Sequence, residues 1–223
     1  MKIAGLTFFD GRVKTTAQTV DWRARLTARK FGGRVTIGTA ATQITGGGAG
    51  TVIDLEQPEG VVSVRKGYTL IPDRISVQCG VPLLASDTDK SEIYLAADVL
   101  SEWPATGTRT DEAIFCTRTT GHTPVAGESE VPGVVAASAF TGDTTTPVLG
   151  MDLDRSLITG DVQGTPASAL WTPLALLHEP VSPDFIVGPA AMYLYWFGTV
   201  ATTGYAQIKF FSVPTDLLDE LFL

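Results

Sequence analysis

The fold class is decided by a stretch near the carboxyl end, Phe185-Ile-Val-Gly-Pro-Ala-Ala-Met-Tyr-Leu-Tyr-Trp-Phe-Gly-Thr-Val-Ala-Thr-Thr-Gly-Tyr-Ala-Gln-Ile-Lys-Phe-Phe-Ser-Val213. It holds two apolar, aromatic runs, Ala191–Phe197 and Tyr205–Val213. Runs of β-branched and aromatic residues bounded by Gly and Pro are typical of β-strands. The spacer Gly198–Gly204 has a Gly at each end and is long enough for a hairpin loop, so we predict a hairpin at the centre of an all-β sandwich.

The two predicted strands differ in pattern. The first is apolar on both faces, which places it deep in a sandwich or against a partner subunit. The second alternates: Tyr205, Gln207, Lys209 and Phe211 share one side, and Ala206, Ile208, Phe210 and Ser212 share the other. One face of the second strand is therefore expected to meet the core.

Working outward, the same pattern recurs along the chain. Eight further stretches resemble strands: Thr51–Leu55, Val61–Arg65, Leu70–Cys79, Glu92–Val99, Ala113–Thr119, Gly133–Ala139, Val148–Leu153 and Leu170–His178. Turn-forming clusters separate them, including two long polar loops at Gly121–Pro132 and Ser156–Ser168. Many short strands at this spacing predict an antiparallel β-sandwich, for which we favour a jelly roll over an immunoglobulin-like order. We assign residues 35–213 to this domain.

The amino-terminal residues 1–34 form a predicted basic arm with a short helix. Within the first 36 residues eight Lys and Arg oppose two Asp, so this segment is +6 while the whole chain is −8. The helix is expected at Thr19–Lys30, before the stop signal Gly32-Gly33. Its candidate contact residues are Trp22, Arg23, Arg25, Arg29 and Lys30. A neighbouring subunit's acidic surface, solvent and nucleic acid are all possible surroundings for this arm.

Residues 214–223 form a predicted acidic, apolar tail. Pro214 ends the last strand, and Leu217, Leu218, Leu221 and Phe222 then follow at helical spacing. Two alternatives are open: the tail folds back on its own domain, or it docks in a partner's groove.

No motif in the sequence declares a reaction, so we predict no catalytic, cofactor-binding or metal site. There is no Gly-x-Ser-x-Gly elbow, and the two histidines, His122 and His178, stand in unrelated contexts. Asp87 and Asp89 could approach a cation, but a solvated turn explains them better. A β-sandwich hydrolase using Glu179, Asp152 or His178 is the weakest of the hypotheses.

The sequence also gives expectations for thiol state and for targeting. The two cysteines, Cys79 and Cys116, are expected to be buried free thiols rather than a disulfide. No signal peptide is evident, and the longest apolar run is far too short to span a bilayer. We expect assembly in the cytoplasm of a host cell and no membrane partner.

Several stretches resemble virion proteins predicted from tailed-phage and environmental-virus sequences. They are Ile71-Pro-Asp-Arg-Ile-Ser-Val-Gln78, Asp143-Thr-Thr-Thr-Pro-Val-Leu149, Gly160-Asp-Val-Gln-Gly-Thr165, Phe185-Ile-Val-Gly-Pro189 and Thr203-Gly-Tyr-Ala-Gln-Ile208. The resemblance covers roughly residues 35–213. It implies a jelly-roll-like subunit that assembles into trimers or larger rings on a capsid.

Our leading hypothesis is therefore a non-enzymatic virion structural protein, a self-assembling subunit of a bacteriophage or other viral capsid or of its decoration layer. It predicts a homo-oligomer, a trimer or higher, with other virion proteins as partners and nucleic acid contacted only through the amino-terminal arm. The alternative is a sugar- or receptor-binding β-sandwich on a viral fibre or a cell surface.

Overall fold

The structure is a computed structural model of the full chain. It describes residues 2–3, 6–9, 12–13, 22–45, 53–79, 90–98, 108–118, 121–141, 146–159, 174–180, 182–198 and 203–218.

One short helix and many strands make up these residues. The helix is α1 (Trp22–Ala28), and a 3₁₀ turn, η2 (Thr215–Leu217), follows the last strand. The strands are β1 (Lys2–Ile3), β2 (Leu6–Phe9), β3 (Arg12–Val13), β4 (Gly32–Ile37), β5 (Ile44–Thr45), β6 (Gly60–Val64), β7 (Tyr68–Cys79), β8 (Lys90–Asp98), β9 (Thr108–Glu112), β10 (Phe115–Cys116), β11 (Val134–Thr141), β12 (Leu149–Thr159), β13 (Leu174–His178), β14 (Ile186–Val187), β15 (Ala190–Gly198) and β16 (Thr203–Pro214).

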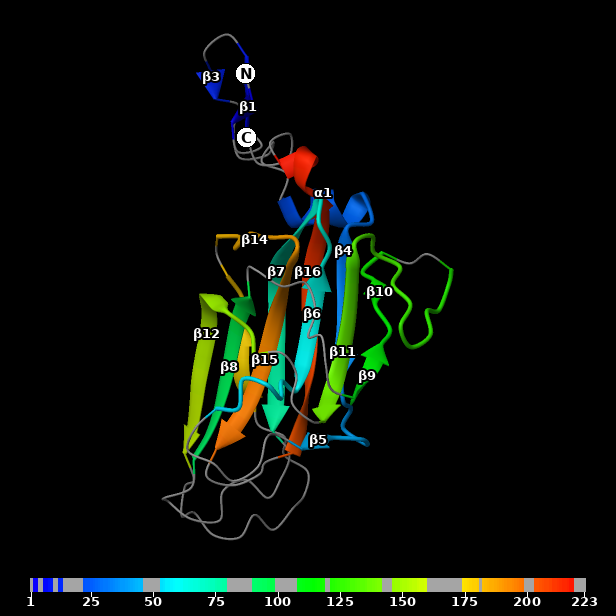
Figure 1. Ribbon diagram of the computed structural model, residues 1–223. Helices are drawn as coiled ribbons and strands as arrows, with labels where there is room; N and C mark the ends of the chain where they lie inside the picture. The colour runs from blue at the N-terminus through cyan, green and yellow to red at the C-terminus, as the bar shows by residue number, and fades with distance from the viewer. Residues whose placement is uncertain are drawn as a thin grey trace.

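Two antiparallel sheets pack face to face as a β-sandwich (Figure 1). The β16 sheet has the order β10-β4-β16-β7-β13, with β14 and β5 pairing at its ends. The β15 sheet has the order β12-β8-β15-β6-β11-β9. The short strands β1, β2 and β3 form a separate small sheet. The predicted all-β antiparallel sandwich with a short amino-terminal helix is confirmed.

The principal strands form nested pairs, in which successive early strands pair with successively earlier ones of the late strands. β4 pairs with β16, β6 with β15, β7 with β13, and β8 with β12. Strands β4, β7, β13 and β16 belong to one sheet, and β6, β8, β12 and β15 to the other. Strands β9, β10 and β11 lie in the connection between β8 and β12 and widen both sheets on one side.

The main core lies between the sheets. The inward faces of β4, β7 and β16 supply Val35, Ile75, Ile208 and Phe210, which meet Trp196 and other residues of the β15 sheet. All of these side chains are at most 1% exposed. As predicted from its two apolar faces, β15 is buried along nearly its whole length.

The predicted hairpin between Ala191–Phe197 and Tyr205–Val213 is wrong. β15 pairs with β6 and β8, whereas β16 pairs with β4 and β7. The connection therefore crosses from one sheet to the other. Each strand still lies at the centre of its own sheet, because its apolar residues require neighbours on both sides.

Other strand boundaries differ from the prediction. The edge strand β9 of the β15 sheet was not predicted, because Thr-Arg-Thr-Asp-Glu has no apolar alternation and is largely exposed. β12 extends to Thr159, into a predicted loop, and residues 53–55 of the predicted strand Thr51–Leu55 form no strand. The predicted boundary between residues 34 and 35 falls within β4, so the arm's last residues begin a sandwich strand.

Helix α1 ends at Ala28, two residues before the predicted helix end at Lys30. Phe31 N donates to Leu26 O, and Lys30 N donates to Thr27 O, the two hydrogen bonds of a Schellman cap. Lys30 holds the left-handed position with φ of 63°. A lysine is strained in this conformation, whereas glycine adopts it freely.

Lys30→Gly should therefore stabilise the protein by about 0.5–1 kcal/mol, because relief of strain exceeds glycine's larger loss of entropy. Thermal unfolding should show a rise in Tm of about 2 °C for a chain of this length. The control Ala28→Gly places the same residue within the helix and should lower stability by about 1 kcal/mol. Equal shifts in both variants would contradict the assignment of Lys30 as the cap.

Candidate functional site

The two segments predicted to contact partners meet at one end of the sandwich. Trp22, Leu217 and Leu218 are partly buried and pack against an apolar cluster on the outer face of the β16 sheet. This cluster contains Leu26, Ile71, Phe211 and Val213. The rings of Trp22 and Phe211 lie edge to face, with centroids 5.4 Å apart. The structure thus directs these side chains to their own domain, at the end that carries α1 in Figure 1.

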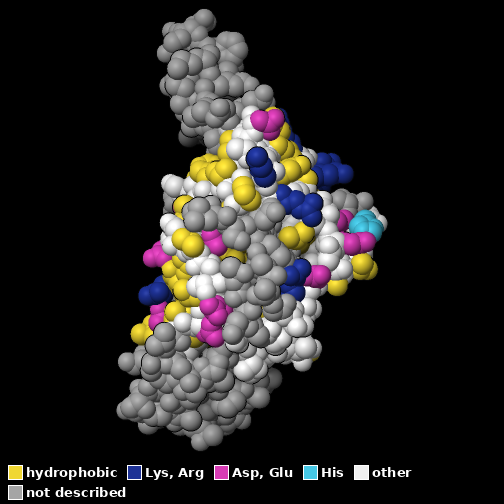
Figure 2. All heavy atoms as spheres, viewed as in Figure 1, with side chains coloured by type: hydrophobic (Ala, Val, Ile, Leu, Met, Phe, Trp, Pro, Cys, Tyr) yellow, Lys and Arg dark blue, Asp and Glu magenta, His cyan; other side chains and the backbone are white. Residues whose placement is uncertain are grey.

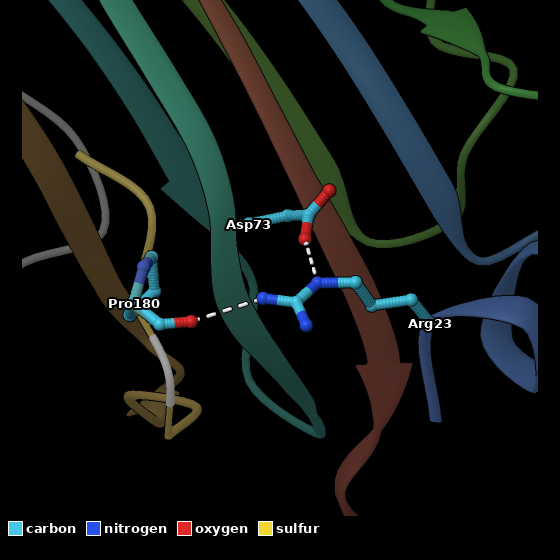
Figure 3. Close-up of polar contacts among 3 residues, drawn as sticks. All are labelled: Arg23, Asp73 and Pro180. Carbon is cyan, nitrogen blue, oxygen red and sulfur yellow. Dashed lines mark hydrogen bonds and ion pairs between the residues drawn. The ribbon is translucent and has the colours of Figure 1, made fainter. Parts of the chain in front are cut away.

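Arg23 fastens α1 to the β16 sheet (Figure 3). Its Nε donates to Asp73 Oδ1 at 2.5 Å, and its Nη2 donates to the carbonyl oxygen of Pro180 at 2.9 Å. The same guanidinium lies over the Trp22 ring, 4.5 Å from its centroid. A cation with these contacts positions the helix across β7 and the segment after β13.

The remaining predicted contact residues are more open. Arg29 and Lys30 are exposed, and Arg25 is half-buried. Leu221 and Phe222 lie outside the described residues, so their predicted contact role stays a prediction. Figure 2 shows basic side chains gathered toward the end of the molecule that carries α1.

Three basic side chains stand abreast on the outer face of the β16 sheet. Lys209 on β16 is the register partner of Arg34 on β4 and of Arg74 on β7. Residues directly opposite in an antiparallel pair project to the same face. The neighbours Val35, Ile75 and Ile208 are in the core, so this basic row faces outward. Arg34 and Arg74 are exposed, and Lys209 is half-buried.

The surroundings of the basic row are mostly neutral. Phe115 on β10 is the register partner of Arg34, whose guanidinium lies 5.6 Å from the ring centroid. The next row along the sheet holds Thr36, Gln207 and Ser76. Within the described residues, no ion pair involves a member of the basic row. The sequence alone did not reveal this row, because its members are far apart in the chain. Only Lys209 was assigned to one face of a predicted strand.

The outer face of the β15 sheet is covered instead. It carries three tyrosines, of which Tyr193 and Tyr195 are stacked with centroids 5.9 Å apart and Tyr94 stacks on Tyr195 at 6.2 Å. Ile53 and Leu55 pack over them, and Tyr195 Oη donates to the Leu55 carbonyl oxygen at 3.0 Å. The tyrosines are at most 7% exposed.

Burial holds these phenols in the neutral form. It is the main cause that raises the pKa of Tyr94 to about 12, and the hydrogen bond from Tyr94 to Asp152 adds to it. Arg155, which lies 4.4 Å above the Tyr94 ring, acts in the opposite direction. Burial also raises the pKa of Tyr193 and of Tyr195, with nearby Asp98 contributing to both.

Folding stability should therefore fall at alkaline pH. These phenols are ordinary in the unfolded chain, with a pKa near 10, so their contribution is complete below about pH 10 and declines as the pH rises through the folded-state value near 12 for Tyr94. Urea unfolding at pH 8, 10 and 11 should show this decline, and Tyr94→Phe should make it shallower. An unchanged decline in Tyr94→Phe would exclude this tyrosine as a source.

A pocket of about 490 Å³ opens at the opposite end from α1. Its walls mix hydroxyl, amide and carboxylate groups, including Thr42, Gln43, Glu59, Glu112 and Ser138. Glu59 is 7% exposed and accepts a hydrogen bond from Trp196 N at 2.5 Å. Ser138 Oγ donates to Glu112.

The backbone of this pocket is irregular. Ala139 has φ of 50°, and the pairing of β11 with β9 shifts register between Ser138 and Thr141. A bulge and a left-handed non-glycine residue commonly occur beside functional sites.

The two predicted histidines lie apart and differ in surroundings. His178 is 6% exposed, and its Nδ1 lies 3.1 Å from Asp154 Oδ2, so this pair links β13 to β12 across the sandwich edge. Its Nε2 is buried, and none of the described residues forms a hydrogen bond with it. His122 is exposed, with Nε2 3.5 Å from Glu128. Glu179 is exposed just beyond β13, and Asp152 accepts from Tyr94.

The described residues also bear on metal binding, thiol state and membrane insertion. The described part of the chain contains no group of three or more His, Cys, Asp or Glu side chains arranged to hold a metal ion. Asp87 and Asp89 lie outside it. Cys116 is a half-buried free thiol, and the side chain of Cys79 is among those not described. None of the described helices is long and apolar enough to cross a membrane.

Comparison with protein-family models, with curated proteins and with solved structures finds no match.

Proposed function

We propose that this chain is a non-enzymatic structural subunit of a virus particle, in the capsid or in its decoration layer. The observation that carries the proposal is the nested pairing of β4 with β16, β6 with β15, β7 with β13, and β8 with β12. A long hairpin rolled into two sheets would give this pairing, and it supports our proposal that the sandwich is a jelly roll. Jelly rolls are common in viral capsid proteins, though also in lectins and cupins.

Because a fold hosts many functions, the surface must supply further support. Three large apolar side chains are exposed on neighbouring strands of one lateral edge: Leu157 on β12 at 58%, Leu177 on β13 at 42% and Val187 on β14 at 51%. Leu177 and Val187 project to the outer face of the β16 sheet with their register partners Ser76 and Thr69, and Leu157 projects to the outer face of the β15 sheet with Glu92. A subunit that covered this edge would contact all three side chains. We assign this edge to a contact between subunits of a homo-oligomer, a trimer or higher.

The two termini complete the proposal. Arg29 and Lys30, exposed beside α1, and Leu221 and Phe222 in the tail are the remaining candidates for contacts with other virion proteins. The particle would assemble in the host cytoplasm. None of these contacts requires a cofactor or a membrane.

Light scattering coupled to size exclusion tests self-assembly, with negative-stain electron microscopy of the eluted species. We expect a trimer or a larger closed particle at high protein concentration. Leu157→Ser/Leu177→Ser should reduce the assembled fraction while leaving the thermal unfolding of the monomer nearly unchanged. Val125→Ser, at an exposed position (62%) outside this edge, is the matched control. A monomer at every protein concentration and salt strength would overturn the proposal that the chain is a self-assembling subunit.

A sugar- or receptor-binding module is the second candidate, favoured by the end pocket. Thr42, Gln43, Glu112 and Ser138 offer the donors and acceptors that recognise hydroxyl groups. A glycan panel probed with wild type and Glu112→Gln tests this candidate. Binding by a monomer that is lost in Glu112→Gln would favour it over the structural subunit.

A further inference from the structure

We infer that the outer face of the β16 sheet is a binding surface for single-stranded nucleic acid, centred on the basic row of Arg34, Lys209 and Arg74. The inference goes beyond the proposed function and does not depend on it. It also differs from the sequence prediction, which placed nucleic acid at the amino-terminal arm alone.

The basic row carries a cost in folding stability. Lys209 has a basic register partner on each side, and like charges directly opposite in a sheet destabilise it. No described acidic side chain forms an ion pair with any of the three. The single nearby acid on β7, Asp73, is engaged with Arg23. Three aligned cations that form no ion pair with a described acid make a site to which an anionic chain is attracted.

The spacing and form of this surface suit a single-stranded chain. Adjacent strands lie about 4.8 Å apart, so the row presents three cations across a span of about 10 Å. A flexible single strand can follow such a row with successive phosphates. Among the described residues, this face carries no protruding helix besides α1, the kind of element that usually enters a duplex groove.

The side chains next to the cations can contact bases and sugars. Phe115 continues the same row beyond Arg34 and is half-buried, so part of its ring is accessible for base stacking. Gln207, Thr36 and Ser76 form the adjacent row and provide hydrogen-bonding groups for base edges or sugars. An acidic protein surface would form ion pairs with the cations, but an aromatic ring in the same row would add little to its binding.

Fluorescence anisotropy with the full chain and a fluorescein-labelled 20-mer of oligo-dT tests this inference. Three neutralised phosphates give a log–log salt slope of about −2, so affinity should fall about 20-fold between 50 and 200 mM NaCl. Arg34→Gln/Lys209→Gln/Arg74→Gln should remove most of the binding and flatten this slope. Phe115→Ala should weaken binding without changing the slope. The triple variant should unfold at the same or a slightly higher temperature, because it removes repulsion.

The matched control removes three cations on the side of the β15 sheet. Arg65→Gln/Lys66→Gln/Arg109→Gln alters net charge by the same amount and should leave most binding intact. Glu179→Gln should strengthen binding, because Glu179 follows His178, the register partner of Ile75, and so lies near the Arg74 end of the row.

Three outcomes would overturn the inference. One is the absence of oligonucleotide binding by wild type at 50 mM salt. Another is unchanged binding in the row variant together with its loss on deletion of residues 1–21, which would assign binding to the arm. The third is equal displacement by poly-glutamate and by unlabelled oligo-dT of the same charge, which would assign the row to an acidic protein partner.

Discussion

Trp196→Ala is expected to lower the free energy of unfolding by about 3–5 kcal/mol, the usual cost of removing a buried Trp. Trp196 is 1% exposed and lies in the main core on the inner face of β15. Alanine would leave a large cavity between the two sheets, since the surrounding strands are fixed by their hydrogen bonds. A typical domain is stable by only about 5–15 kcal/mol, so this variant should be close to unfolding at 37 °C.

Urea denaturation of Trp196→Ala, followed by far-UV circular dichroism, gives the free energy directly. Phe185→Ala is the control, because Phe185 is an aromatic residue that is 38% exposed. Its loss should be about 1 kcal/mol or less. A similar small loss at Trp196 would mean that the sheets close over the cavity and that this ring does not set their spacing.

Gly204→Ala is expected to cost about 3 kcal/mol for a different reason, overpacking. A Cβ at residue 204 would lie 1.9 Å from Cη2 of Trp196 and 2.1 Å from the main-chain oxygen of Gln78. The ring is held by the core, and the carbonyl belongs to β7, which pairs with β16. Neither neighbour can withdraw without disturbing a sheet.

Gly60→Ala is the matched comparison for Gly204→Ala. Its Cβ would also lie close to a neighbour, 2.1 Å from Ile37 Cδ1, but this atom is the far end of a flexible side chain. We expect a loss of about 1 kcal/mol there. If both glycine variants lose the same free energy in urea titrations, then contact with a main-chain atom is not what makes Gly204 sensitive. Trp196→Leu should partly suppress Gly204→Ala, because it relieves the ring contact and leaves only the carbonyl contact.

The strands that hold Gly204 and Trp196 illustrate what the sequence could and could not predict. The strands around both residues were evident from their aromatic and β-branched composition, and the burial of both faces of β15 followed from its pattern. That the two strands belong to opposite sheets was not evident. The spacer length permits a hairpin and a crossing equally, and only the competition of β4, β6, β7 and β8 for partners decides between them.

Surface features were still less accessible to sequence reasoning. The charge of the first 36 residues suggested a free basic arm, but Trp22 and Leu26 pack on Phe211 and its neighbours, so α1 belongs to the domain surface. The basic row joins residues 34, 74 and 209, and a shift of one residue in either register would send one cation to the core face. Such a site depends on strand register, which local composition does not encode.

The nested pairing has a consequence for the timing of synthesis. The ladder between β4 and β16 pairs Gly32 with Phe211, so β4 cannot form this ladder until β16 has been synthesised. Until β16 leaves the ribosome, β4 and β7 lack the strand that lies between them, and both expose unpaired edges. Folding dominated by such distant contacts is slow and prone to aggregation. Nascent chains should therefore gain protease resistance only after residue 214 has emerged, and chaperones that cover strand edges should raise the soluble yield.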